Sequence, residues 1–493
     1  LLRLNPDVGR RPETNTVIII PNNKSKNTQI AENTKIEETK TDEIETPIEV
    51  KNEEVVDAID TELEELKKNF VVHKVKPKET VYGLTRFYNI TKEELFALNP
   101  SVENEGLKID QFIKIKPIKT EEDAEENETF EDNIKYGTSL KIALLLPFRA
   151  NEYKETDSKD IFRNNRLANI VTDFYMGAEI AIDSIKKQGV NLDIKVFDTG
   201  KKNSKIRALA SNSYVENADV VIGPFYYEEA KIVASNVKAP VVFPMYSKNQ
   251  NSLTSSKIIK TAPNKSSYLN SLTSYLSDSY NGETIIVVGD GKTESNNNVT
   301  KIVASLKKND SIDKVSILKP VKGYIKKERF TDLMKPKTHT WVIVASNDNV
   351  AVADALNSMI TLPEEVTAQV FALEKNNAFN RVDNFKLAKI NFSYVTNEYL
   401  DDSSFANKTF NKKYKSINKT LPSNYATKGF DITYDVLARL SSSEGDLKET
   451  LNQGSSYRLI SKFDYNKRLF GATNNEGLFI VKYNSDLSLT RLR

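Results

Sequence analysis

The sequence predicts an α/β protein whose larger part forms two doubly wound parallel-sheet lobes, preceded by at least one small βααβ domain. Short apolar runs alternate with amphipathic helical segments from residue 139 almost to the end, and this succession occurs twice. A strand, two short helices and a second strand fit within residues 70–117. A chain of 493 residues is long enough for domains of both kinds.

The first residues of the chain repeat part of the small domain. Leu1–Val8 (LLRLNPDV) aligns with Leu95–Val102 (LFALNPSV), and each segment continues through a polar loop to an apolar run closed by proline. An ordered repeat of this kind predicts a second copy of the domain, so we assign residues 1–21 to the C-terminal part of an incomplete first copy. Because Leu1 is not an initiator methionine, we expect a processed or truncated chain, and a lost signal or lipid anchor stays open.

Two segments have the composition of linkers. Residues 22–69 are rich in Asn, Lys, Glu, Thr and Asp with isolated Ile and Val, which cannot bury enough apolar surface to offset chain entropy. We predict a flexible linker there, with a transient helix over residues 53–68 as an option. The acidic stretch Glu121–Asp132 predicts a second, extended linker over residues 118–138.

Helix start and stop signals define the small domain. Thr80 can cap a first helix, while Thr91 and Glu94 form a capping box that opens a second helix. Asn99-Pro100 is expected to end the second helix. The alternating segment Phe70–Lys76 and the apolar run before Pro117 supply the two strands. The residues expected to face the core from the helices are Val81, Leu84, Tyr88, Leu95 and Leu98.

With these signals, residues 70–117 resemble the LysM domain. The resemblance implies a βααβ fold and binding to glycans that contain N-acetylglucosamine, such as peptidoglycan. Lys78, Asp110 and Lys116 depart from the family pattern. In the family, the glycan lies between the loop before the first helix and the loop after the second; carried over, these loops are Glu79, Thr80 and Val81 facing Asn99, Pro100 and Ser101. The alternative is that Thr80 and Asn99 only cap helices.

The larger part reads as two successive sets of strands and helices. The strands predicted for the first set are 140–148, 191–197, 218–223 and 241–244, and those for the second set are 284–288, 314–318, 340–345, 369–372 and 390–395. A doubly wound sheet binds its ligand at the carboxyl ends of its strands. Two such lobes in tandem therefore predict a cleft between them.

Five segments resemble the type I periplasmic binding proteins: KIALLLPF, DFYMGAEIAID, DVVIGPFYYEEA, APVVFPMYS and ATKGFDITYDVL. The resemblance covers about residues 139–493 and implies a ligand between the two lobes, contacted by loops that follow the strands. Carried over position by position, the lining residues are Pro147, Phe148, Gly223, Pro224, Phe225, Tyr246 and Ser247 in the first lobe and Asp290 and Asn347 in the second. The alternative for the aromatic residues is packing between the lobes. No Arg or Asp stands out as the clamp that amino-acid binders of the family use.

Composition excludes several classes of function. Lys+Arg 70 against Asp+Glu 68 gives a net charge of +2, so no global field favours nucleic acid or a membrane surface. With no Cys and only two His, thiolate and histidine-rich metal sites are excluded, and we expect no metal or cofactor. No apolar run is long enough for a transmembrane helix. No nucleophile elbow, Walker loop, zinc-protease motif or dinucleotide fingerprint occurs, so we predict no enzyme.

These interpretations predict a non-catalytic cell-envelope protein of the periplasm. LysM repeats tether it to peptidoglycan, and the two lobes bind a small ligand or a protein partner. The combination resembles hybrid proteins of Bacteroidota, and the outer-membrane lipoprotein activator of peptidoglycan synthases is a second relative by architecture. The alternative is a structural or regulatory subunit of a larger outer-membrane or secretion complex with no small ligand. Ligand identity, oligomeric state and an anchor to the outer membrane stay open.

Overall fold

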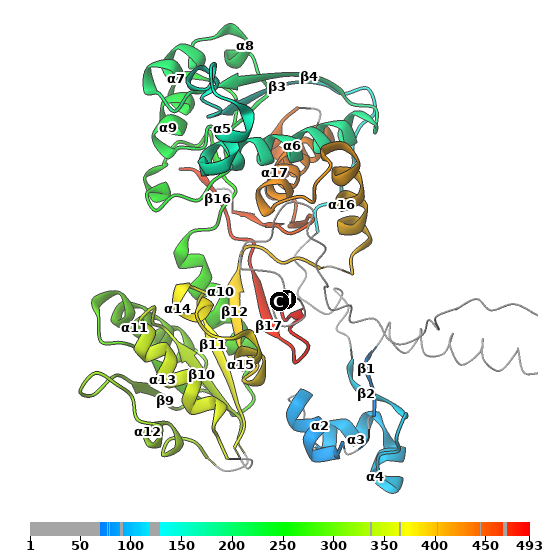
Figure 1. Cartoon of the computed structure of the whole chain (residues 1–493), viewed down its shortest axis with the longest axis vertical. Helices are drawn as coiled ribbons and strands as arrows, with labels where there is room; N and C mark the ends of the chain where they lie inside the picture. Colours follow the sequence, from blue (N-terminus) through cyan, green and yellow to red (C-terminus); the bar gives the residue numbers. More distant parts are fainter. Residues whose placement is uncertain are drawn as a thin grey trace, which may run out of the picture. The chain divides into compact units, whose positions relative to one another are not determined.

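The computed structural model describes residues 70–75, 77, 79–88, 92–117, 129–335, 338–363, 366–401, 403–443, 445–466 and 471–493. The predictions for the incomplete first copy (1–21), the linker 22–69, residues 118–128 of the acidic linker and the capping residue Thr91 lie outside the described residues. The described residues form a small domain, blue in Figure 1, and a two-lobed domain, coloured from cyan to red.

The small domain is a two-stranded antiparallel sheet with helices between its strands. Its elements are β1 (Phe70–Lys74), α2 (Val81–Tyr88), α3 (Lys92–Leu98), α4 (Pro100–Glu105) and β2 (Phe112–Pro117). The Thr80 hydroxyl oxygen accepts the Gly83 N–H at 3.0 Å, which confirms the predicted cap. The core consists of Val75, Leu84, Leu95, Val102, Ile113 and Ile115.

Helix α4 differs from the prediction. Asn99-Pro100 was expected to end the helical part of the domain, but Pro100 instead opens α4. A proline has no N–H to contribute, and the first turn of a helix needs none, so the same residue that ends α3 can begin the next helix. The third helix adds Val102 to the core.

The first lobe is built on a seven-stranded sheet in the order β15-β16-β7-β6-β5-β3-β4. Its strands are β3 (Ser139–Leu146), β4 (Asn191–Asp198), β5 (Val220–Ile222), β6 (Val241–Phe243), β7 (Ile258–Lys260), β15 (Tyr465–Asn466) and β16 (Thr473–Asn475). Its helices are α5 (Ser158–Asn164), α6 (Arg166–Lys186), α7 (Asn203–Ala210), α8 (Ser213–Glu216), α9 (Tyr227–Asn236), α16 (Phe405–Asn418), α17 (Asn424–Ser442) and α18 (Leu447–Thr450). One core lies between the sheet and the α6–α17 pair, and a second lies between the sheet and α7, α8 and α9.

Two glycines allow α6 and α17 to pack closely. A Cβ atom on Gly177 would lie 1.7 Å from the carbonyl oxygen of Ala426, and one on Gly429 would lie 2.0 Å from that of Phe174. Any larger residue would force the helices apart. The glycines in the segments DFYMGAEIAID and ATKGFDITYDVL therefore have a packing role.

The second lobe repeats the arrangement in the order β18-β17-β12-β11-β10-β8-β9. Its strands are β8 (Thr284–Val288), β9 (Val315–Leu318), β10 (Thr340–Val344), β11 (Ala368–Ala372), β12 (Ser393–Thr396), β17 (Phe479–Tyr483) and β18 (Leu489–Arg491). Its helices are α10 (Lys265–Asp278), α11 (Thr293–Leu306), α12 (Glu328–Thr331), α13 (Asn349–Ile360), α14 (Asn377–Asn380) and α15 (Asn384–Lys389). Buried clusters cover both faces of this sheet as well. The prediction of two doubly wound lobes is confirmed.

Residues 129–138 differ from the predicted linker. The Phe130 N–H donates to the Ser455 carbonyl at 2.8 Å, the Phe130 side chain is buried, and Asp132 pairs with Arg458 at 2.7 Å. Arg458 of the first lobe thus holds the end of the acidic stretch and compensates the charge of Asp132. The first lobe begins at about Thr129 rather than at residue 139.

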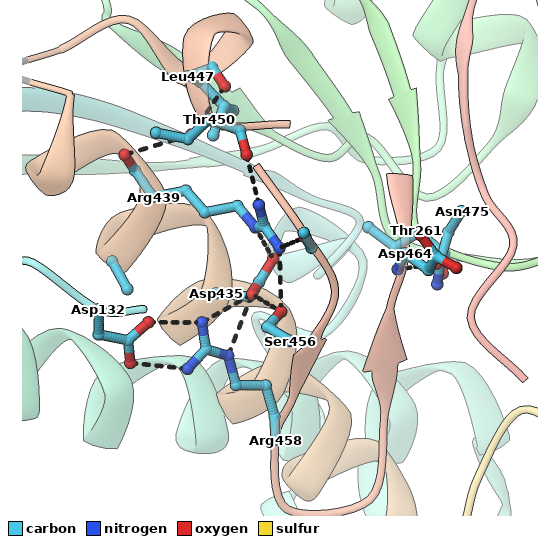
Figure 2. Close-up of polar contacts among 12 residues, drawn as sticks. Asp132, Thr261, Asp435, Arg439, Leu447, Thr450, Ser456, Arg458, Asp464 and Asn475 are labelled. Carbon is cyan, nitrogen blue, oxygen red and sulfur yellow. Dashed lines mark hydrogen bonds and ion pairs between the residues drawn. The ribbon is translucent and has the colours of Figure 1, made fainter. Parts of the chain in front are cut away.

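Through Arg458, Asp132 is connected to a buried network of ion pairs (Figure 2). Asp435 and Arg439 are fully buried and lie 3.1 Å apart on α17, and Arg458 donates to Asp435 at 2.8 Å. Burial alone would raise the pKa of Asp435, but the two guanidinium groups hold it below its usual value. The network joins α17, the strand pair β13 (Ser456–Tyr457) and β14 (Lys462–Phe463), and the segment that leads into the lobe.

Asn475 links two of the segments through which the chain passes from the first lobe to the second. Its amide nitrogen donates to the carbonyls of Thr261 at 2.8 Å and Lys462 at 3.0 Å, and its oxygen accepts the Asp464 N–H at 2.8 Å (Figure 2). Thr261 directly follows β7, where the chain leaves the first lobe, and Asn475 ends β16, where it leaves again. A buried amide whose partners are all satisfied holds these two segments together.

Candidate functional site

The first loop of the predicted glycan site is oriented by β1. The Glu79 carboxylate lies 2.7 Å from Nε2 of His73, and both side chains are partly buried. Thr80 is exposed, although its hydroxyl oxygen is engaged as the cap of α2. Val81 packs against the core of the domain. The groups of this loop that a ligand can reach are therefore the partly exposed side chain of Glu79 and the methyl and hydroxyl groups of Thr80.

The second loop contains a side chain that is fully engaged. The Asn99 amide donates to the Leu95 carbonyl at 2.8 Å and to the Lys114 carbonyl at 2.5 Å, and its oxygen accepts the Lys114 N–H at 2.8 Å. Asn99 thus ties the end of α3 to β2. Pro100 and Ser101, which follow it, are exposed. The exposed part of the predicted site consists of Thr80, Pro100 and Ser101, whereas Asn99 supports it from beneath.

Two of the aromatic residues predicted for the inter-lobe site pack within the first lobe. Phe148, two residues after β3, lies edge-on to Tyr175 with ring centroids 5.7 Å apart, beside Pro147. Phe225 is only 6% exposed and lies edge-on to Phe174 at 5.1 Å. Phe225 is therefore covered on the α6 side of the core, whereas Phe148 packs there while partly buried.

Gly223 and Pro224 form the turn after β5. Gly223 has a φ of 98° and a Cβ atom there would lie 2.2 Å from the Leu145 carbonyl oxygen, so only glycine fits. Its N–H donates to the Val242 carbonyl at 2.9 Å. The turn brings the ends of β3, β5 and β6 together, as the predicted site requires.

Tyr246 and Ser247 follow β6 and lie nearer to solvent. Tyr246 is 45% exposed, and Nζ of Lys265 lies 5.5 Å from its ring centroid. The Ser247 N–H donates to the side chain of the buried Gln250 at 3.2 Å. The Tyr246 ring is accordingly an aromatic surface of the first lobe that a ligand could contact.

The second-lobe residues belong to two neighbouring sets of polar contacts. Asp290 accepts the Ser346 hydroxyl at 2.8 Å and the Lys292 N–H at 2.7 Å, and Asn347 accepts the side-chain amide of Asn376. These residues follow β8, β10 and β11, so the carboxyl edge of the sheet brings them together as predicted for parallel strands. Their side chains already have partners within the lobe.

A pocket that sequence reasoning missed lies between α5, α6 and α17. It has a volume of about 310 Å³ and is lined by Arg163, Asn164, Arg166, Asn169, Ile170, Asp173 and Tyr425. The Asp173 carboxylate accepts the Ser423 hydroxyl at 2.6 Å. The sequence does not reveal this pocket, because the segments that form it are more than 200 residues apart. The one local signal for it is the pair of arginines, Arg163 and Arg166, on either side of the helix cap Asn165.

Glu229 is a buried carboxylate outside the predicted sites, although an acidic pair such as Glu228-Glu229 is normally solvated. It lies in the first turn of α9, which follows the Gly223 turn, and it is only 3% exposed. Its Oε2 atom has no hydrogen-bond partner within the described part of the chain. Burial raises the pKa of Glu229 to about 7, and the Thr199 hydroxyl and the charge of Lys201 offset only part of this effect.

Among the described residues, no group of three His, Cys, Asp or Glu side chains is arranged to hold a metal ion. None of the helices in the same ranges has the length and apolar character needed to cross a bilayer. His339 is partly buried with Nδ1 2.8 Å from the Thr367 hydroxyl, and desolvation lowers its pKa to about 4.

Comparison with known families identifies the small domain. The family model of the LysM domain matches residues 73–116, and this segment is a LysM domain, as the start and stop signals predicted. Residues from about 129 to the end form two lobes on mostly parallel seven-stranded sheets, which is the architecture that the resemblance to type I periplasmic binding proteins implies. The expected resemblance of residues 70–117 to the LysM domain is confirmed. No curated protein matches the sequence.

Several solved structures resemble the two lobes at a distance. A putative branched-chain amino acid ABC transporter protein from Rhodospirillum rubrum has 13% identity and a TM-score of 0.48, covering 72% of this chain and 100% of that chain. An ABC transporter substrate-binding protein from Desulfitobacterium hafniense, in complex with Leu, has 14% identity and a TM-score of 0.40 over 72% and 100%. LpoA from Haemophilus influenzae has 11% identity and a TM-score of 0.43, covering 73% of this chain and 60% of that chain. Likenesses this distant carry no argument about what the present chain binds.

Proposed function

We propose that this chain is a non-catalytic protein of the bacterial cell envelope, located in the periplasm, that binds peptidoglycan through its LysM domain. The observation that carries the proposal is the LysM match over residues 73–116. The exposed Thr80 and Ser101 support it, because hydroxyl groups and nearby backbone amides suit the hydroxyl and acetamide groups of N-acetylglucosamine. The two lobes then act at the cell wall.

Sedimentation with purified peptidoglycan tests the glycan-binding part. The full chain is expected to sediment with the polymer, and a fragment from Thr129 to Arg493 is expected to stay in solution. Ser101→Trp should reduce retention by filling the predicted groove, whereas Glu103→Trp, an exposed position on the same helix, should not. Equal retention of the full chain and the fragment would refute the LysM tether.

For the lobes, the proposed role is to bind a small ligand or a protein partner at the carboxyl ends of their strands. Tyr246 supplies an exposed ring, and Asp290 with Asn347 supplies polar contacts fixed by Ser346 and Asn376. A ligand that binds the folded lobes raises their melting temperature by an amount that grows with the logarithm of its concentration above Kd. Amino acids, muropeptides and sugars are the candidates to screen, with Tyr246→Ala as the variant that should lose the shift.

A structural or regulatory subunit without a small ligand is the second candidate. Phe148 and Phe225 pack inside the first lobe, and the side chains of Asp290 and Asn347 are engaged within the second. A site whose groups are already paired gains less from a small ligand. If no compound in the screen raises the melting temperature, this second function is favoured; a Tyr246-dependent rise excludes a pure scaffold.

A further inference from the structure

Strand β4 is an open edge of the first-lobe sheet. It is the last strand in the sheet order, and no strand among the described residues pairs with its outer side (Figure 1). All eight residues from Asn191 to Asp198 pair with β3 without a register shift. Proteins usually shorten, bulge or cover such an edge, because its unpaired peptide groups are a template for another strand. β4 is long and regular and contains neither Pro nor Gly.

The peptide groups on the outer side can be assigned from the pairing with β3. The Asn191 N–H donates to the Thr138 carbonyl at 2.8 Å, so it faces β3. Peptide groups alternate in direction along a strand, which turns those of Leu192, Ile194 and Val196 outward. Val196 is also 39% exposed, a high value for a valine in the interior of a strand.

The charges of β4 are self-complementary. In the sequence NLDIKVFD, antiparallel pairing of two copies around Ile194 places Asp193 opposite Lys195 twice and Leu192 opposite Val196. Registers centred on Asp193 or on Lys195 would instead set like charges opposite each other. Nζ of Lys195 lies 4.4 Å from the ring centroid of Tyr214, which fixes the side chain on one face of the sheet.

We propose that two copies of this chain associate through β4, paired antiparallel in the register centred on Ile194, so that their first-lobe sheets form one continuous sheet. A pairing of single strand edges buries less surface than the roughly 1,200–2,000 Å² of a standard interface, so the dimer is weak. Chains gathered on a polymer are at high local concentration, where weak pairing suffices. Each dimer then presents its LysM domains in pairs, and the second glycan contact becomes intramolecular.

Single cysteines test the register directly, because the natural sequence contains no cysteine. Ile194→Cys places two thiols on the symmetry axis, where the Cα atoms of paired residues are about 5.5 Å apart, within the range for a disulfide. Val196→Cys is the matched control, because the two thiols are then about 14 Å apart along the strands. Under mild oxidation, the full-length Ile194→Cys chain should form a covalent dimer at least tenfold faster than Val196→Cys. Since position 196 is the more exposed of the two, equal rates or faster linkage at 196 would overturn the proposal.

Charge reversal tests the same interface without a covalent bond. Sedimentation equilibrium of the cysteine-free chain should show a species of twice the chain mass of 55.7 kDa. Lys195→Asp should weaken association at least tenfold, because it sets acidic side chains opposite each other. The double variant Asp193→Lys with Lys195→Asp should restore it. The proposal would be overturned by a wild-type chain that stays monomeric at high concentration, or by a dimer that neither change affects. Thermal melting confirms that each variant is folded.

Discussion

At the scale of single residues, Asn99 shows how a predicted ligand contact can instead hold the binding loop in place. Its three hydrogen bonds join α3 to β2 beneath the exposed Pro100 and Ser101. We expect Asn99→Ala to destabilise the LysM domain by roughly 2–4 kcal/mol, because the partly buried N–H and carbonyl of Lys114 lose the Asn99 side chain as their partner. Hydrogen exchange over residues 92–117 of the full chain measures this loss.

The exposed neighbour Ser101 provides the control for this prediction. Ser101→Ala should leave the exchange rates of α3 and β2 unchanged, since its side chain is exposed at the start of α4. If Asn99→Ala kept wild-type protection but lost peptidoglycan retention, Asn99 would be a ligand contact and not a support.

Glu229 makes stability depend on pH. Its pKa is raised from 4.5 to about 7 in the folded chain, so the native state binds this proton more tightly than the unfolded state does. The free energy of unfolding therefore falls as pH rises through this window. Glu229→Gln removes the buried charge, and we expect it to stabilise the lobes by up to about 3 kcal/mol at a pH well above 7.

Below pH 4.5 the carboxyl group is protonated in both states, and the Gln variant should then match the wild type. Denaturant unfolding at the two pH values measures the difference. A stabilisation that is the same at both pH values would mean that the Gln side chain acts through packing and not through charge.

At the scale of elements, the segment before β3 is part of the first lobe. The Phe130 ring lies 4.1 Å from the guanidinium carbon of the buried Arg439, and Asp132 pairs with Arg458. A fragment that begins at Ser139 lacks both contacts and leaves Arg458 with less compensation for its charge. We expect it to be less stable than a fragment beginning at Thr129 by about 3–5 kcal/mol, measured by denaturant unfolding.

Asp132→Asn in the longer fragment separates the two contributions. It should cause only part of the loss, because Phe130 remains buried. Equal unfolding midpoints for the fragments from Ser139 and Thr129 would show that residues 129–138 add no stability.

The elements that the sequence predicts well are those determined by local patterns. The Thr80 cap and the apolar runs of β3, β8 and β10 depend on neighbouring residues, and each lies within a few residues of its predicted place. The differences arise from contacts between distant residues. Phe130 donates its N–H to Ser455 and packs its ring against Arg439, both more than 300 residues away, which no local composition reveals.

The candidate sites show the same division. Repetition of strands and helices is enough to predict which loops meet at the carboxyl ends of the strands, and Asp290 and Asn347 do lie in neighbouring polar contacts after β8 and β10. Whether a side chain faces a ligand or the core depends on the opposite element. Phe225 is covered by Phe174 of α6, and the Arg163 pocket forms only where α17 returns to α6.

At the scale of the whole molecule, the cores of the LysM domain and of the lobes are separate clusters. The LysM core contains only residues between Val75 and Ile115, whereas every cluster of the lobes consists of residues from Ile134 onward. A domain of this size buries a smaller fraction of its surface than the lobes do and has a lower margin of stability. We therefore expect the full chain to unfold in two thermal transitions, with the LysM domain unfolding first.

Ligands should then shift the two transitions independently. Under the proposed function, oligomers of N-acetylglucosamine should raise only the first transition, by an amount that grows with the logarithm of their concentration. The fragment from Thr129 to Arg493 should lack this transition and show no response to the oligomers. Calorimetry of both chains measures the outcome. A single transition in the full chain that rises as a whole with the oligomers would mean that the LysM domain and the lobes unfold as one cooperative unit, and that the glycan stabilises them together.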